Sequence, residues 1–180
     1  MGWTWNYGAQ AMDIMEAILT RRSIRRYTGE PVSDTQLQHV IRAGCHAPSA
    51  HNGQPWHFVV IREPDLLRQV AEVHPYAKMA PQAGTCIVVC GDTARQAEIG
   101  FLVEDCSACI ENMLLAARGM DLGSVWCGLH PIPRLTDAMR AFLSLPDGIV
   151  PVGMVVVGHG AEERTVSDRY DEAKVHWGKW

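Results

Sequence analysis

The sequence predicts a single domain that mixes helices with β-strands, of the α/β or α+β class. Three short segments rich in aromatic and β-branched residues, 56–62, 85–91 and 150–158, have the composition of strands. Over residues 99–120, apolar side chains recur every three or four positions, which is typical of a long, largely buried helix. The 180 residues show no repeat, low-complexity tract or internal linker, so we expect one core.

The first half of the chain divides at its breakers. Apolar spacing predicts a helix over residues 12–20. Ser33 with Gln36 three positions later is a capping-box signature for a second helix that ends near residue 45. Residues 47–55 are rich in Pro, Ser, Asn and Gly and predict a loop before the strand at 56–62.

The second half alternates helices and strands. Pro64 can occupy the first turn of a helix to about residue 73, because its missing N–H costs nothing there. The continuous apolar run at 85–91 predicts a central strand. Residues 124–129 predict a strand or an extended loop, and a helix over about 134–144 should follow Pro133 before the strand at 150–158.

Charge and composition disfavour several partners. A net charge of -4 and a pI near 6.0 argue against a broad surface for nucleic acid or membrane lipid. There is no secretory signal pattern and no apolar run of about 18 residues, so we expect a cytoplasmic protein. Six cysteines spread through apolar segments fit a reducing compartment. Residues 1–11 are interpreted as an N-terminal extension that is disordered or docks through Trp3 and Trp5.

Four arginines surround Ser23 in the stretch TRRSIRRY. If this stretch is extended, Arg21, Ser23 and Arg25 lie on one side and Arg22 with Arg26 mostly on another. One side can then converge on a phosphate, where guanidinium groups and a hydroxyl supply charge-assisted hydrogen bonds. A solvated basic turn with surface ion pairs explains the cluster equally well. No GxGxxG or GxxxxGK(S/T) motif is present to hold a phosphate instead.

The loop APSAHNGQPW offers donors and acceptors from Ser49, His51, Asn52 and Gln54 to a polar heterocycle, although an ordinary tight connection would have the same composition.

Several reactive side chains on or near the long helix have a simpler interpretation. Cys106 and Cys109 have metal-like spacing, but their apolar helix and the lack of a second ligand pair favour packing, and we expect no metal. Cys127 likewise lacks a convincing partner for nucleophilic work. Glu104 and Asp105 could support a site, but exposed or interface charge is the simpler interpretation.

Taken together, RRSIRRYTGEPV, APSAHNGQPWHFVV and GMDLGSVWCGLHP resemble successive signatures of the nitroreductase superfamily of FMN-dependent NAD(P)H oxidoreductases. The similarity extends from Met12 to Trp180. It implies an α+β fold with a mostly antiparallel central sheet flanked by helices. It also implies an intertwined homodimer in which residues 12–180 form one FMN-binding domain whose C-terminal segment reaches the partner subunit.

The resemblance also implies the cofactor contacts. The resemblance implies no catalytic side chain, because the flavin N5 takes the hydride. Arg26 lies outside the matched set. The matched residues are Arg21, Arg22, Ser23 and Arg25 for the FMN phosphate and ribityl chain, with Arg169 in the tail; Pro48, Ser49, Ala50, Asn52 and Gln54 in the loop that the other subunit contributes; and Trp126, Cys127 and Gly128 beside the flavin ring.

The expected activity is hydride transfer from NADH or NADPH through FMN to a nitroaromatic, quinone or related small-molecule acceptor, by a ping-pong mechanism. The alternative is a flavin-binding protein for FMN storage, sensing or degradation, or a specialised reductase, for example a dehalogenating one, that does not use NAD(P)H directly. The two tryptophans near the C-terminus, Trp177 and Trp180, should pack on a surface, which the resemblance places on the partner.

Overall fold

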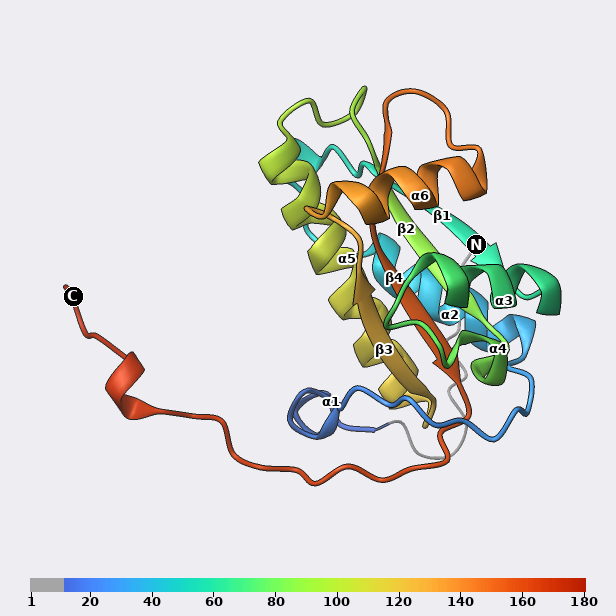
Figure 1. Cartoon of the computed structure of the whole chain (residues 1–180). Helices are drawn as coiled ribbons and strands as arrows, with labels where there is room; N and C mark the ends of the chain where they lie inside the picture. The colour runs from blue at the N-terminus through green and yellow to red at the C-terminus, as the bar shows by residue number, and fades with distance from the viewer. Residues whose placement is uncertain (1–11) are drawn as a thin grey trace, which may run out of the picture.

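A four-stranded sheet lies at the centre of the computed structural model, which describes residues 12–180 (Figure 1). Every neighbouring pair of strands is antiparallel, as the resemblance implied. The strands, in the sheet order β1-β2-β4-β3, are β1 (Trp56–Ile61), β2 (Cys86–Asp92), β4 (Ile149–Gly158) and β3 (Gly123–Gly128). The suggested extension at residues 1–11 lies outside the described residues.

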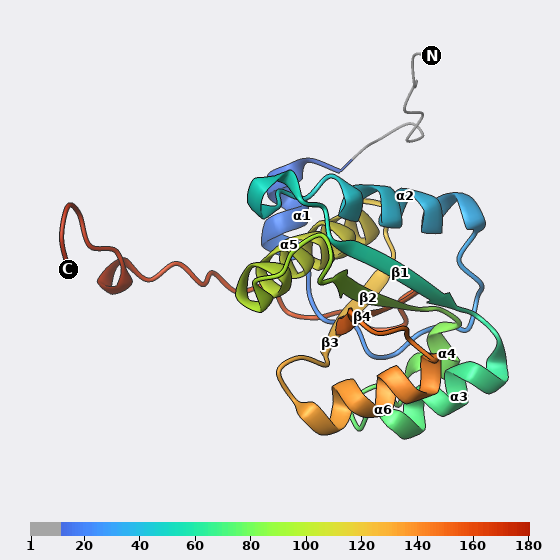
Figure 2. The ribbon, with the colours of Figure 1, turned by 90° about the horizontal axis from the view of Figure 1, so that it is seen from above.

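Helices cover both faces of the sheet, so the α+β prediction is confirmed. Figure 2 shows one layer of helices above the strands and a second layer below them. The first layer contains α1 (Ile14–Thr20), α2 (Asp34–Cys45) and α5 (Ile99–Gly119), and the second contains α3 (Pro64–Val73), α4 (Ala80–Ala83) and α6 (Pro133–Leu143).

Alternation along β2 divides the apolar core between these layers. Ile87 and Val89 pack into the cluster beside α2 and α5, whereas Cys86, Val88 and Cys90 pack into the cluster beside α3, α4 and α6. Successive side chains of a strand point to opposite faces, so a strand covered on both sides is apolar throughout. This explains why residues 85–91 are a continuous apolar run.

Most of the sequence-based boundaries hold within one or two residues. The Ser33–Gln36 capping box is present at the start of α2, and residues 123–128 form a strand, β3, not a loop. Three short elements were not expected: α4, and 3₁₀ turns over Ala50–Asn52 and Glu172–Lys174. Helix α4 has only 4 residues and therefore no readable period; it ends at Gly84, whose φ of +77° suits glycine.

A bulge in β4 aligns the end of β3. Val89 pairs with Gly153 but Cys90 pairs with Pro151, so Val152 is the extra residue. The carbonyl oxygen of Val152 then accepts hydrogen bonds of 3.1 and 3.0 Å from the backbone N–H groups of Leu129 and His130. The chain that leaves β3 is thereby tied to β4.

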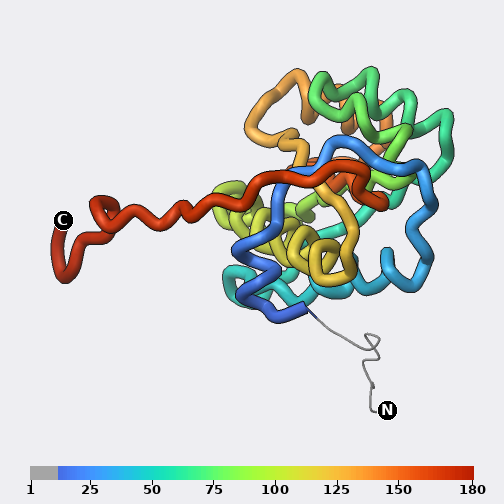
Figure 3. Tube along the Cα trace, turned by 90° about the horizontal axis from the view of Figure 1, so that it is seen from below, coloured from blue at the N-terminus to red at the C-terminus, as the bar shows by residue number. Residues whose placement is uncertain are grey.

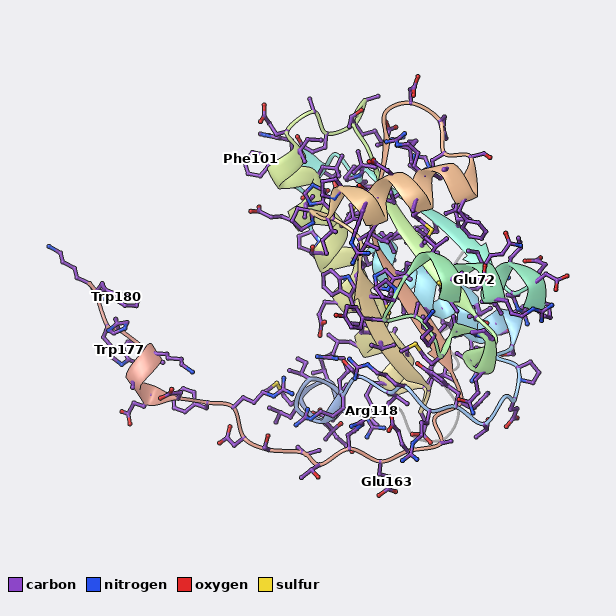
Figure 4. All side chains as sticks on the ribbon, in the orientation of Figure 1. Glu72, Phe101, Arg118, Glu163, Trp177 and Trp180 are labelled. Carbon is purple, nitrogen blue, oxygen red and sulfur yellow. The ribbon has the colours of Figure 1, made fainter. Side chains whose placement is uncertain are left out.

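Residues 161–180, the C-terminal arm, leave the body of the domain (Figure 1). Trp177 is 89% exposed and Trp180 100% exposed, and Figure 4 shows both far from the body of the domain. Neither tryptophan packs on the body of its own chain; the Trp180 ring lies 4.1 Å from that of His176, between centroids.

Candidate flavin site

Residues 20–27, which we call the arginine segment, lie along the free edge of β3. Ser23 forms a parallel bridge with Ser124, and the Ile24 N–H donates a 3.0 Å hydrogen bond to the Ser124 carbonyl oxygen. Further on, Tyr27 bridges to Gly160, and the Ala161 N–H donates to the Arg26 carbonyl oxygen at 2.9 Å. The start of the arm therefore runs beside this segment, as Figure 3 shows. The expected extended conformation is observed.

Arg22 and Arg26 face the arm. The Arg22 guanidinium donates to the carbonyl oxygens of Leu19 at 2.9 Å and Arg21 at 2.8 Å, and it reaches those of Thr165 and Ser167 in the arm at 3.3 and 3.4 Å. The Arg26 Nε lies 3.5 Å from a carboxylate oxygen of Glu162. Both guanidinium groups thus have protein partners.

Arg21, Ser23 and Arg25 alternate with those two. The Arg21 Nε lies 3.2 Å from Glu111, but in a geometry that makes no hydrogen bond, and this buried nitrogen has no hydrogen-bond partner among residues 12–180. Within the same residues, the Ser23 hydroxyl and the exposed Arg25 guanidinium form no hydrogen bond or ion pair. Donors without partners on one side of an extended segment suit an anion with several oxygens.

A pocket of about 510 Å³ lies between the end of α1, the C-terminal end of α5, the start of β3 and the arm. Arg21 and Arg22 line it together with Arg118 and Arg164, which sequence reasoning missed. Arg118 stands in the last turn of α5, where its Nε donates to the Thr20 hydroxyl at 3.1 Å (Figure 4). A basic residue at a helix C-terminus was the available signal for Arg118.

The loop between α2 and β1 is held by its own side chains. It contains a short 3₁₀ turn over Ala50–Asn52. The Ser49 hydroxyl accepts from the Gln54 N–H at 3.0 Å, and the Asn52 side-chain oxygen accepts from the Gln54 amide at 2.7 Å. His51, Asn52 and Gln54 all have positive φ, at 53°, 55° and 48°. Such conformations persist only where surrounding contacts enforce them, and they cluster at binding sites.

Asp105 lies beneath this loop, and the expectation of an exposed or interface charge was wrong for it. The residue is 5% exposed, and its Oδ1 accepts a 2.8 Å hydrogen bond from the Ala50 N–H. Its neighbour Glu104 is exposed, as expected. Sequence periodicity placed both on α5 but could not say which one the loop covers.

Trp126 and Cys127 point to opposite faces of β3. The Trp126 indole lies across Gly153, where an added Cβ would be 2.4 Å from its Nε1. Cys127 is buried on the other face, and its thiol lies 3.5 Å from the Tyr76 carbonyl oxygen. Burial raises the pKa of this thiol to about 11, so it is protonated at neutral pH. The packing interpretation of Cys127 is therefore confirmed.

Gly128 is exposed at the end of β3, and its carbonyl oxygen lies 2.8 Å from the Nε2 of His74. The Nδ1 of this buried histidine accepts the Tyr76 N–H at 3.2 Å, which makes Nε2 the protonated nitrogen of the neutral ring. His74 was not singled out from the sequence. It fixes the backbone at the point where the resemblance places the flavin ring.

The loop and the arginine segment lie at different places along α5. Ala50 contacts Asp105, whereas Thr20 contacts Arg118, 13 positions later. At 1.5 Å per residue, that separation is about 20 Å along the helix. The arginine segment lies against the start of β3, but the loop is not brought to it within this chain.

Arg169 is exposed in the arm, two residues beyond the Ser167 carbonyl that Arg22 contacts. Cys106 and Cys109 are completely buried beside α2 and the sheet, and burial raises the pKa of Cys106 to about 12. Packing therefore accounts for both cysteines. Over residues 12–180, no group of three or more His, Cys, Asp or Glu could hold a metal ion, and no helix is long and apolar enough to cross a membrane.

Solved structures that carry nitroreductase names share this fold. The model of the nitroreductase family matches residues 18–159, and the chain belongs to that family. A protein of Methanothermobacter thermautotrophicus, provisionally named an NADH dehydrogenase/NAD(P)H nitroreductase, is 38% identical over 94% of this chain and 88% of its own length.

Two crystal structures extend the comparison. A protein of the same provisional name from Parabacteroides distasonis is 36% identical, with a TM-score of 0.89 over 93% of this chain and 98% of its own. A provisionally named nitroreductase from Desulfovibrio desulfuricans, solved in complex with FMN, is 31% identical, with a TM-score of 0.79 over 92% and 96% of the two chains.

Proposed function

We propose that this chain is an FMN-dependent oxidoreductase that takes hydride from NADH or NADPH and reduces a nitroaromatic, a quinone or a related conjugated acceptor in two alternating half-reactions. Membership of the nitroreductase family and the FMN complex of a relative support the cofactor. The observation that carries the proposal is that the Arg21 Nε, the Ser23 hydroxyl and the Arg25 guanidinium make no hydrogen bond within residues 12–180, although Arg21 forms an ion pair with Glu111.

These residues fit a phosphate monoester. Two guanidinium groups match its double negative charge, and the hydroxyl adds a neutral donor. The buried Arg21 Nε is ion-paired with Glu111 but makes no hydrogen bond, so it can still donate one. Arg169 would join them from the arm. Arg22, whose guanidinium is occupied by carbonyl oxygens, would act by holding the arm in place.

The ring would lie beside Trp126, Cys127 and Gly128, the part of β3 that continues from Ser124. The Cys127 side chain is turned into the core, so it would not contact the ring. The backbone of this stretch, which His74 fixes at Gly128, would make the contacts instead. Bound FMN supplies hydride acceptance and donation. The protein has to position the ring, the nicotinamide and the acceptor, and no acid–base pair is needed for that.

A second copy of the chain would complete the site. The loop residues Pro48, Ser49, Ala50, Asn52 and Gln54 lie away from the arginine segment of their own chain, so we assign them to the flavin of a partner. Apolar side chains of α1 remain exposed beside a groove of about 730 Å³ between α1, α2 and α5. Such a surface is typical of a homodimer interface. With all six cysteines free, we propose the cytoplasm as its compartment.

Flavin spectroscopy tests the proposal. Purified protein should show flavin absorbance that bleaches under anaerobic conditions on addition of NADH or NADPH and returns with a quinone or nitroaromatic. Loss of one charge-assisted bond, about 1.5–3 kcal/mol, should weaken FMN binding by about 10- to 150-fold in Arg25→Ala. Arg68→Ala, on the exposed face of α3, is the matched control. Protein that takes up no FMN would refute the proposal, and tight FMN that neither nicotinamide reduces would favour a storage or sensing role.

A further inference from the structure

Glu162, at the start of the C-terminal arm, accepts hydrogen bonds from the backbone of the arginine segment. Its Oε1 accepts the N–H of Arg25 at 2.6 Å and that of Arg26 at 3.2 Å. Its Oε2 lies 2.9 Å from the Arg164 guanidinium and 3.5 Å from that of Arg26. One carboxylate therefore binds two consecutive N–H groups and two side-chain cations.

The Glu162 carboxylate is buried although its two ion-pair partners lie at the surface. The Glu162 side chain is 5% exposed, whereas those of its ion-pair partners Arg26 and Arg164 are 75% and 46% exposed. The N–H of Arg25 is the main cause that holds the pKa of Glu162 below its usual range, followed by Arg164. Glu162 is therefore charged at neutral pH and accepts all these bonds as an anion.

The contacts determine which arginines remain available. Side chains of an extended segment alternate, so fixing the N–H groups of Arg25 and Arg26 from the arm sends the Arg26 guanidinium toward Glu162 and the Arg25 guanidinium to the other side. Arg26 and Arg164 are neutralised by the same carboxylate. Among residues 12–180, the Arg25 guanidinium has no carboxylate contact, and the proposed function assigns it to the phosphate.

We propose that Glu162 is a positioning residue for the cofactor phosphate: it orients Arg25 through the backbone and withholds Arg26 and Arg164 from the anion. This inference rests on the proposed function. It also links the arm to cofactor binding, because Arg22 holds the next residues of the arm, Thr165 and Ser167. In this role Glu162 affects binding of the FMN phosphate and not of the flavin ring.

Comparison of FMN with riboflavin, which lacks the phosphate, tests this role in the full-length protein. Flavin would be removed by dialysis against a chaotropic salt, and the affinity for each flavin measured by fluorescence quenching. In Glu162→Ala we expect FMN affinity to fall by about tenfold or more while riboflavin affinity changes less than about twofold. Glu162→Gln keeps an acceptor for the two N–H groups but loses the ion pairs, and its loss should be smaller. If the alanine variant does not fold by circular dichroism, the glutamine variant decides.

The control is Glu72→Gln, which removes the same charge far from the arm. Glu72 is exposed on α3 and does not line the pocket at Arg21 and Arg22. Unchanged FMN affinity in folded Glu162→Ala would overturn the inference, as would equal losses for both flavins, which indicate general disorder. Tighter FMN binding would overturn it too, since the acid would then merely repel the phosphate. If the wild-type protein binds neither flavin, the proposed function fails, and the inference fails with it.

Discussion

The buried carboxylate of Asp105 on α5 accepts a 2.8 Å hydrogen bond from the backbone N–H of Ala50 in the loop before β1. This hydrogen bond joins the loop to the longest helix of the fold. Three residues of the loop, His51, Asn52 and Gln54, have positive φ, and each such conformation costs about 1 kcal/mol or more without support. Asp105 therefore helps to maintain a conformation that the loop would not adopt alone.

Replacement of Asp105 tests this support. Asp105→Ala leaves the Ala50 N–H without its acceptor and should lower the free energy of unfolding by about 1–3 kcal/mol. Asp105→Asn keeps an acceptor oxygen and should lose less. Urea unfolding followed by circular dichroism gives these values, and Glu104→Ala, at an exposed position of the same helix, should change stability by less than about 0.5 kcal/mol. A wild-type value in Asp105→Ala would contradict the role.

Gly153 makes room for Trp126. An added Cβ would stand 2.4 Å from the indole Nε1, 3.1 Å from Ile110 and 3.2 Å from another indole atom. We expect Gly153→Ala to displace the indole, to shift the tryptophan emission and to cost about 1–3 kcal/mol of stability through overpacking.

Gly100 provides the control for this prediction. It lies in the first turn of α5, and an added Cβ there meets nothing within 4 Å. Gly100→Ala should be neutral or stabilise by up to about 1 kcal/mol, because alanine favours the helix. If both variants behave alike in thermal melts and emission spectra, the close approach of the indole to Gly153 is not what constrains that position.

Thiol reactivity should distinguish one cysteine from the other five. Cys45 is exposed, whereas Cys86, Cys90, Cys106, Cys109 and Cys127 are buried. In native protein a disulfide reagent should modify Cys45 rapidly, and the others only in denaturant. Partial burial raises the pKa of Cys45 above its ordinary value, so its thiolate fraction and its reaction rate should keep rising with pH beyond that value. More than one fast equivalent in native protein, or a rate that levels off below the ordinary thiol pKa, would contradict this assignment.

The sequence predicted the regular elements better than the contacts of the site. Periodicity located α5 and the strands, because burial imposes a repeat on their side chains. It also gave the alternation of the arginine segment, which agrees with the contacts that Arg22 and Arg26 both make with the arm. Periodicity could not identify the contacts of Glu162 or Asp105, because their partners lie far away in the sequence and are brought close only by the fold. Arg164 was missed for the same reason.

The C-terminal arm should matter more for flavin binding than for the fold. The elements from α1 to β4 contain both apolar clusters, whereas the arm is exposed along nearly all its length. Truncation before Ala161 removes Glu162, Arg169 and the tryptophans Trp177 and Trp180. We expect the truncated chain to keep its far-ultraviolet circular dichroism, to bind FMN at least about tenfold more weakly, and to lose part of its dimer stability. Light scattering should give the 180-residue protein a mass of twice 19.9 kDa, the mass of one chain.

The double variant Trp177→Ala/Trp180→Ala separates the effect of the arm on the dimer from its effect on flavin binding. If the tryptophans pack on a partner, the variant should weaken the dimer while leaving the Glu162 contacts intact. A folded monomer with full flavin occupancy would contradict both the arm's role and the shared site.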